Sequence, residues 1–95
     1  MKNSLIIFFE RAGADHRLRT SHISLYLALY TRWLAGGRKD RLPLDRESAM
    51  ATSRILSRSC YYKRLAELSK WGYIEYQPQK WAGEKSEVRM RRVKR

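Results

Sequence analysis

The stretch SCYYKRLAELSKWGYIEY, residues 59–76, changes its pattern part-way along. In its first part, apolar side chains recur every three or four positions, as they do on one face of an α-helix. They are Tyr61, Leu65 and Leu68. Gly72 suits the left-handed conformation that ends many helices, and from Ile74 onward apolar and polar residues alternate as in a half-buried strand. The stretch therefore predicts a helix over about 58–71 that leads through one glycine into a strand.

Alternation returns near the end of the chain, in SEVRMRRV. Val88 and Met90 are expected to face inward, and Arg89 and Arg91 outward. The intervening QKWAGEK, residues 79–85, reads as a loop because glycine supplies turn conformations. Two strands joined in this way predict a β-hairpin, which needs a packing partner to be stable. The apolar stripe of the preceding helix can supply that partner.

Two helices are predicted nearer the start. NSLIIFFERAG predicts a short helix that Ser4 begins and that ends near Gly13. HISLYLALYTRWLAGG predicts a longer helix, capped by Thr20 or Ser21 and ended by its Gly-Gly pair. Its expected buried face consists of Ile23, Leu27, Tyr30 and Leu34. Other large apolar residues cover the remaining sides of this helix, so a central position in the fold is predicted.

Between these helices and the opening stretch lies LPL, residues 42–44, a short extended piece because its proline disfavours helix in the residue before it. Asp45 is a good N-cap, so a helix over 46–53 is predicted, with Ala49 and Met50 facing inward. RILS then reads as a tight connection between this helix and the next one.

Net charge is the most unusual property of the chain. Twenty-one Lys and Arg residues stand against nine Asp and Glu, a net charge of +12. Such a surplus on 95 residues repels itself, and an acidic polymer would relieve that repulsion. Phosphate backbones of nucleic acids are the usual polymer of this kind. Solubility alone, an anionic membrane or an acidic protein are the alternative explanations.

Length and composition predict one domain that spans residues 1–95. No apolar run approaches the roughly 20 residues that a membrane span needs. LIIFF, residues 5–9, is too short for the core of a signal peptide. The single Cys60 cannot form an internal disulfide, which fits a reducing interior. A cytoplasmic location without a membrane partner is therefore expected.

The order helix, short strand, helix, turn, helix, hairpin resembles the winged helix-turn-helix family of DNA-binding domains. The resemblance runs from His22 to about Val93 through LPLDRESAMA, RILSRSCYYKRLAEL and SKWGYIEYQPQ. The WGYI junction also looks similar to small winged-helix proteins of Bacteroides-type mobile elements and to DNA-binding domains of plasmid and phage replication initiators. The resemblance implies a mainly α fold with a small β-hairpin (α+β), to which the helix predicted from NSLIIFFERAG adds an extra N-terminal helix. Residues 1–19 would form a helical extension and connector, 20–93 the winged-helix core and 94–95 a basic tail.

In this family the second helix of the pair lies in the DNA major groove, with its N-terminal residues nearest the bases. The resemblance assigns that role to Ser57, Arg58, Ser59, Tyr62 and Lys63. The helical wheel independently places Ser59, Lys63, Ala66 and Lys70 opposite the buried stripe. Arg58 and Lys63 suit either guanine acceptors or phosphates, and Tyr62 suits a phosphate or a thymine methyl group. The alternative is an ordinary solvated helix surface.

The hairpin, or wing, lies along the DNA backbone or in a minor groove in this family. Candidate backbone contacts in the turn and wing are Arg54, Lys80, Lys85, Arg89 and Arg91. Such contacts position a protein without reading sequence. Trp81 is expected to fold back over the hairpin, although an exposed tryptophan there would be able to stack on a sugar or base.

No pattern indicates a catalytic site, a metal site or a cofactor. His16, His22 and Cys60 lack metal-ligand spacing, and the acidic pairs Asp45/Glu47 and Glu84/Glu87 are explained by capping and by a loop. We therefore expect a protein that is no enzyme and that binds specific double-stranded DNA, as a transcriptional regulator or an accessory factor of a mobile element. Alternatives are a protein-interaction or RNA-binding winged-helix module and a replication-initiation accessory domain. The apolar N-terminal helix either caps the core or pairs two copies in a homodimer.

Overall fold

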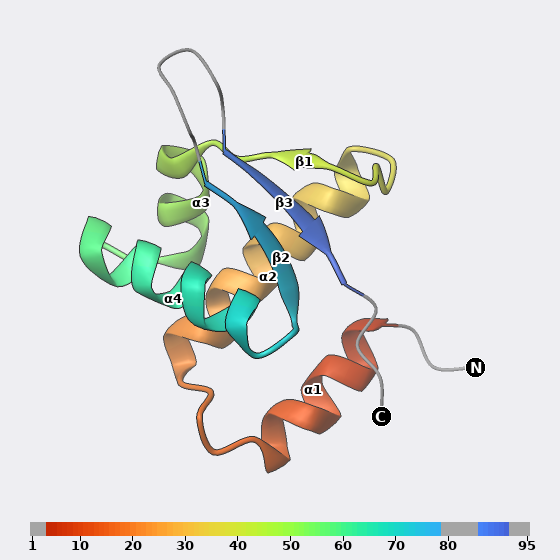
Figure 1. Ribbon diagram of the computed structural model, residues 1–95, viewed down its shortest axis with the longest axis vertical. Coiled ribbons are helices and arrows are strands. Elements are labelled where there is room, and N and C mark those ends of the chain that lie inside the picture. Colours follow the sequence, from red (N-terminus) through yellow and green to blue (C-terminus); the bar gives the residue numbers. More distant parts are fainter. Residues whose placement is uncertain (1–3, 79–85, 92–95) are drawn as a thin grey trace.

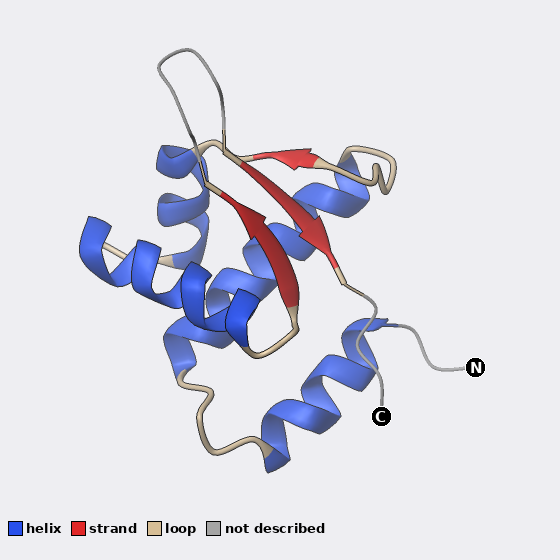
Figure 2. Cartoon of the chain, in the orientation of Figure 1, coloured by secondary structure: helices blue, strands red, loops and turns tan. Residues whose placement is uncertain are grey.

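The computed structural model describes residues 4–78 and 86–91. Within them the elements are α1 (Ser4–Ala14), α2 (Thr20–Ala35), β1 (Leu42–Pro43), α3 (Arg46–Ser53), α4 (Arg58–Lys70), β2 (Ile74–Gln77) and β3 (Glu87–Met90). The strands form a single antiparallel sheet, and the helices lie behind and beside it (Figures 1 and 2). The fold is therefore α+β, and its order of elements is consistent in topology with a winged helix.

The sheet has one strand more than the predicted hairpin. Its order is β1-β3-β2, so β3 lies in the centre and the short LPL piece becomes an edge strand. Leu42 lies opposite Val88 and Pro43 opposite Glu87. An edge suits Pro43 because proline has no N–H to donate to a second neighbour. Two residues are too few to show any alternation, so the sequence gives no signal for this pairing.

The predicted helix pair agrees with the structure. On α4 the side chains of Tyr61, Leu65 and Leu68 are fully or almost fully buried. Gly72 has a φ of +85°, the left-handed conformation expected of it. At the start of α3 the Asp45 carboxylate accepts a hydrogen bond from the Ser48 N–H at 3.4 Å, as expected of an N-cap.

The predicted buried face of α2 is wrong in part. The helix does cross the middle of the fold (Figure 1), but the side chains that it buries are His22, Leu25, Tyr26, Ala28, Leu29 and Tyr30. Ile23 and Leu27 are only half-buried, and Leu34 is 41% exposed. The observed buried stripe begins at a polar residue, His22. Apolar periodicity alone therefore places the buried face of α2 at the wrong positions. The helix also begins one residue after Arg19, which takes the N-cap position expected of Thr20 or Ser21.

The N-terminal helix α1 packs on the protein's own core. Phe8 is fully buried, and its ring stacks on the ring of Tyr26 with a centroid separation of 3.7 Å. The edge of a third ring, Tyr73, completes the cluster at 5.3 Å. One of the two roles expected for this helix, covering the core, is therefore present. Pairing of two copies through the same helix stays a prediction.

Candidate nucleic-acid interface

The solvent side of α4 is the first part of the candidate interface. The helix packs against α2 and β2 with its apolar stripe. Its exposed side chains are Arg58, Ser59, Tyr62, Lys63, Ala66 and Lys70, called the α4 face below. Four of the five residues that the resemblance assigned to base contacts thus lie on one exposed surface, and all four occupy the first two turns of the helix.

Ser57, the fifth assigned residue, caps the helix. It occupies the N-cap of α4, where its Oγ accepts a hydrogen bond from the Cys60 N–H at 3.2 Å. The Oγ atoms of Ser57 and Ser59 are 2.9 Å apart and share a hydrogen bond. A side chain that caps a helix satisfies a backbone donor that would otherwise lack a partner. Ser57 therefore fixes the start of α4, and Ser59 is the more available hydroxyl.

Tyr62 connects the α4 face to α3. Its ring is 41% exposed, and its hydroxyl oxygen accepts a hydrogen bond from Nη1 of Arg46 at 3.3 Å. This hydrogen bond raises the pKa of Arg46. Sequence reasoning missed Arg46, because a contact between residues sixteen positions apart leaves no periodic signal. The contact places one more cation beside the start of α4.

Arg54 lies in the turn between α3 and α4. It has left-handed backbone angles, φ 63° and ψ 27°, and its N–H donates to the carbonyl oxygen of Ala51 at 3.3 Å. A residue other than glycine adopts these angles at a steric cost of about 1–2 kcal/mol. The side chain is exposed, so its charge is directed to solvent at the turn.

The β2–β3 pair carries less free positive charge than predicted. Arg89 does lie on the outer face of the sheet, but its guanidinium is 3.2 Å from an Asp40 carboxylate oxygen and 3.7 Å from one of Glu75. Arg91 is exposed just after β3. Lys80, Trp81 and Lys85 lie outside the described residues. Arginine counts alone cannot reveal that two carboxylates from other segments face Arg89.

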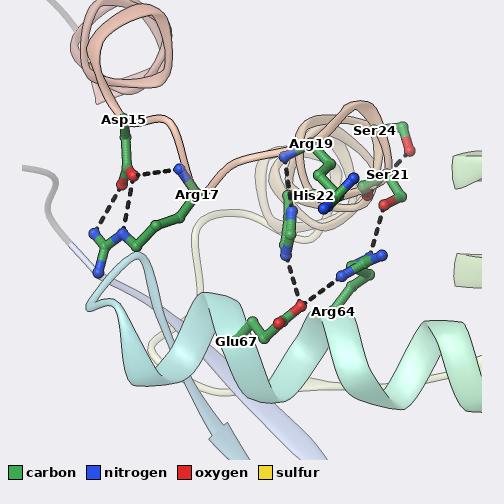
Figure 3. A network of polar contacts seen from close by, with 8 residues as sticks. All are labelled: Asp15, Arg17, Arg19, Ser21, His22, Ser24, Arg64 and Glu67. Carbon is green, nitrogen blue, oxygen red and sulfur yellow. Dashed lines mark hydrogen bonds and ion pairs between the residues drawn. The ribbon is translucent and has the colours of Figure 1, made fainter.

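A polar network fixes α4 against the start of α2 (Figure 3). The ring of His22 is fully buried; its Nδ1 accepts a hydrogen bond from the Arg19 N–H, and its Nε2 lies 2.9 Å from Oε1 of Glu67. Because Nδ1 accepts, Nε2 carries the ring proton and donates it to Glu67. Arg64 donates to the same Glu67 oxygen at 2.7 Å and to Oγ of Ser21 at 2.8 Å.

A second cluster ties the connector after α1 to the end of α4. Arg17 donates to both carboxylate oxygens of Asp15, at 2.9 and 2.8 Å, and lies over the ring of Trp71 (Figure 3 shows the carboxylate contact). The hydroxyl of Tyr73 donates to the same carboxylate at 2.7 Å. The Arg17 hydrogen bond is the main reason that the pKa of Asp15 is held well below its usual range. The sequence predicted only a connector here.

No family model, curated protein or solved structure matches this chain. In the part of the chain that the structure describes, every helix falls short of the length or the apolar character that crossing a bilayer requires. The same residues hold no group of three His, Cys, Asp or Glu side chains arranged for a metal ion.

Stability should decrease in mild acid because of His22. Burial lowers the pKa of this histidine below its usual 6.5, despite the opposing hydrogen bond to Glu67. The unfolded chain therefore binds a proton more readily than the native protein does as the pH falls below about 6.5. The free energy of unfolding is fully retained above that pH and should fall below it, with a slope that approaches about 1.4 kcal/mol per pH unit.

Urea unfolding between about pH 7.5 and 5.5 measures this slope. His22→Gln should flatten the dependence, whereas His16→Gln, which removes an exposed histidine, should leave it as in the wild type. A wild-type stability that is constant across this range would contradict the assignment to His22.

Proposed function

We propose that this chain is a winged helix-turn-helix protein that binds double-stranded DNA sequence-specifically. In this proposal α3 and α4 form the helix-turn-helix, and α4 enters the major groove, which has the width to admit one α-helix. The observation that carries the proposal is the α4 face. Arg58, Ser59, Tyr62 and Lys63 stand exposed at the N-terminal end of a helix whose opposite face is buried.

Electrostatics supports the same orientation. Arg46, Arg54 and Arg58 come from the start of α3, the turn and the start of α4, and Arg46 contacts Tyr62 on the α4 face. Together with the net charge of +12, they favour a surface covered with phosphates. On the proposed wing, Arg91 and the lysines 80 and 85 would contact the backbone, and Arg89 would have to leave its carboxylate partners to do so.

In this proposal the protein acts by occupying a DNA site. Binding would regulate transcription or assist a mobile element, and it requires no chemical step. Double-stranded RNA is a poorer fit, because the deep and narrow major groove of its A-form helix does not admit side chains. Competition between duplex DNA and duplex RNA therefore separates this proposal from an RNA-binding module.

Two measurements test the proposal. Salt titration of binding to a DNA duplex should give a log–log slope near −5, the value for about six phosphate contacts. Selection from random oligonucleotides with the purified protein should yield a consensus site. A slope near zero, equal binding of duplex RNA, or the absence of any consensus would each argue against sequence-specific duplex binding.

Arg54→Gly should raise the stability of the protein and weaken its binding to duplex DNA. Glycine adopts positive φ without the steric cost, so the free energy of unfolding should rise by up to about 1 kcal/mol. The lost turn charge should weaken duplex binding several-fold. Urea unfolding and duplex titration measure the two effects.

Arg38→Gly is the matched control for this variant. Arg38 also has a positive φ, 60°, but it lies in the loop between α2 and β1, on the side of the fold away from the start of α4 (Figure 1). Its gain in stability should be smaller, because the variant also loses the contact of the Arg38 guanidinium with the Trp33 ring, 5.9 Å from the ring centroid, and it should keep most of its affinity. Equal losses of affinity in the two variants would show that Arg54 acts only through net charge.

A further inference from the structure

A hollow of about 300 Å³ lies between α3 and the start of α4. Much of its lining is apolar and comes from Met50, Ala51, Ile55 and Leu56. Arg46, Glu47 and Arg58 complete the lining. None of the apolar members was among the residues assigned to DNA from the sequence, where RILS was interpreted only as a connection.

Leu56 is the unusual member of this set. It directly precedes the N-cap Ser57, a position where a hydrophobic side chain often packs back on the fourth residue of the helix. That residue is Tyr61, which is buried, yet the side chain of Leu56 is 94% exposed. Leu56 therefore does not make the local contact that its position favours, and it projects into solvent beside the hollow.

The hollow is continuous with the α4 face. Arg46 lines the hollow and also donates its hydrogen bond to Tyr62, which belongs to that face. Arg58 belongs to both surfaces. Whatever approaches the first turns of α4 therefore also meets Leu56.

We propose that Leu56 and this hollow receive the 5-methyl group of a thymine, which makes Leu56 a specificity-determining residue. The inference rests on the proposed function, since it needs α4 in a major groove. The thymine methyl is the apolar group that the base pairs present there, and an apolar side chain is its natural contact. Arg46 and Arg58 at the edges suit phosphates, whereas Glu47 would repel a phosphate from the hollow itself. A neutral base edge fits this distribution of charge better than the backbone does.

A single exposed leucine among arginines fits a base edge better than it fits a protein partner. Interfaces between proteins usually need a contiguous apolar patch at their centre, with few charges inside it. Here the apolar surface is small, because Ile55 is buried and Met50 half-buried, and the charged side chains of Arg46, Glu47 and Arg58 border it. A protein partner at this place would leave all duplex affinities unchanged when Leu56 is truncated.

The test uses the consensus duplex from oligonucleotide selection, with its thymines replaced one at a time by deoxyuridine, which lacks only the methyl group. The wild type should lose about fourfold in affinity at one thymine, the fold-change that corresponds to roughly 0.8 kcal/mol per buried CH₂. Leu56→Ala should bind the two forms of that duplex equally. Leu34→Ala, which truncates a leucine that is 41% exposed at the far end of α2, should keep the wild-type difference.

Three results would overturn the inference: a consensus without thymine, no methyl effect in the wild type, or an undiminished effect in Leu56→Ala. Each of them leaves sequence-specific duplex binding intact, so they differ from failure of the proposed function, in which no consensus appears. Circular dichroism and thermal unfolding should show that Leu56→Ala folds normally, because a side chain that is 94% exposed contributes little to the core.

Discussion

Phe8→Ala should lower the free energy of unfolding by about 3–5 kcal/mol, the usual cost of truncating a buried phenylalanine. The ring is fully buried between Tyr26 of α2 and Tyr73 near the start of β2. Its removal leaves a cavity between the ring of Tyr26 in α2 and the ring of Tyr73 in the turn before β2. Because Phe8 is the one fully buried side chain that α1 contributes within the described residues, α1 should also lose most of its hold on the core. Urea unfolding followed by circular dichroism measures the loss.

Phe9→Ala is the matched control. Phe9 is the next residue of the same helix, and its side chain is 45% exposed, so its truncation should cost well under half as much. A larger cost for Phe9 than for Phe8 would contradict the packing of α1 on its own chain. If the unfolding midpoint also depended on protein concentration, that result would favour a dimer formed through α1.

Truncation of Arg58 and Lys63 together should weaken binding to the consensus duplex by about 100-fold or more. Each side chain stands on the α4 face, and a good bidentate contact of such a cation with guanine is worth roughly 1–3 kcal/mol. If both side chains touch phosphates, the log–log salt slope should become shallower by about 1.8. If either reads guanine, the double variant should instead prefer a different site in oligonucleotide selection. Fluorescence anisotropy over a salt series distinguishes these outcomes.

Lys70→Ala controls for the loss of charge alone. Lys70 is exposed on the same helix but at its last residue, the end that would lie farthest from the base edges. Its loss should change affinity only slightly. Arg89→Ala should weaken all duplexes to a similar and modest extent, because Asp40 and Glu75 already neutralise part of that charge. An effect of Lys70→Ala as large as that of the double variant would argue against insertion of the N-terminal end of α4.

The parts of the fold that the sequence predicted are those set by local patterns. The stripe on α4, the cap at Asp45 and the left-handed Gly72 each depend on residues within one or two turns of each other. Contacts between distant residues left no such pattern. The pairing of β1 with β3 and the hydrogen bond between Asp15 and Tyr73, 58 positions apart, arise only when separate elements meet.

The candidate site likewise contains residues that local patterns predicted and residues that they did not. Exposure of Ser59, Tyr62 and Lys63 followed from the position of the buried stripe on the same helix. Arg46 and Leu56 were missed. The first is defined by a contact across two helices, and the second by the failure of a local contact that its position favours. Composition likewise indicated a basic wing but gave no information about the carboxylates that face Arg89.

The hydrogen bond between Tyr73 and Asp15 also affects the orientation of α4. Tyr73 lies between α4 and β2, so this hydrogen bond, together with the packing of α4 on α2 and β2, helps to hold the orientation of a helix of 13 residues, about 20 Å long. A rotation of about 5° at this end of α4 would swing the tip near Ser59 by roughly 2 Å, more than a hydrogen bond tolerates. Loss of the segment before residue 20 would therefore change the orientation of α4, even where every residue on the exposed surface of α4 is intact.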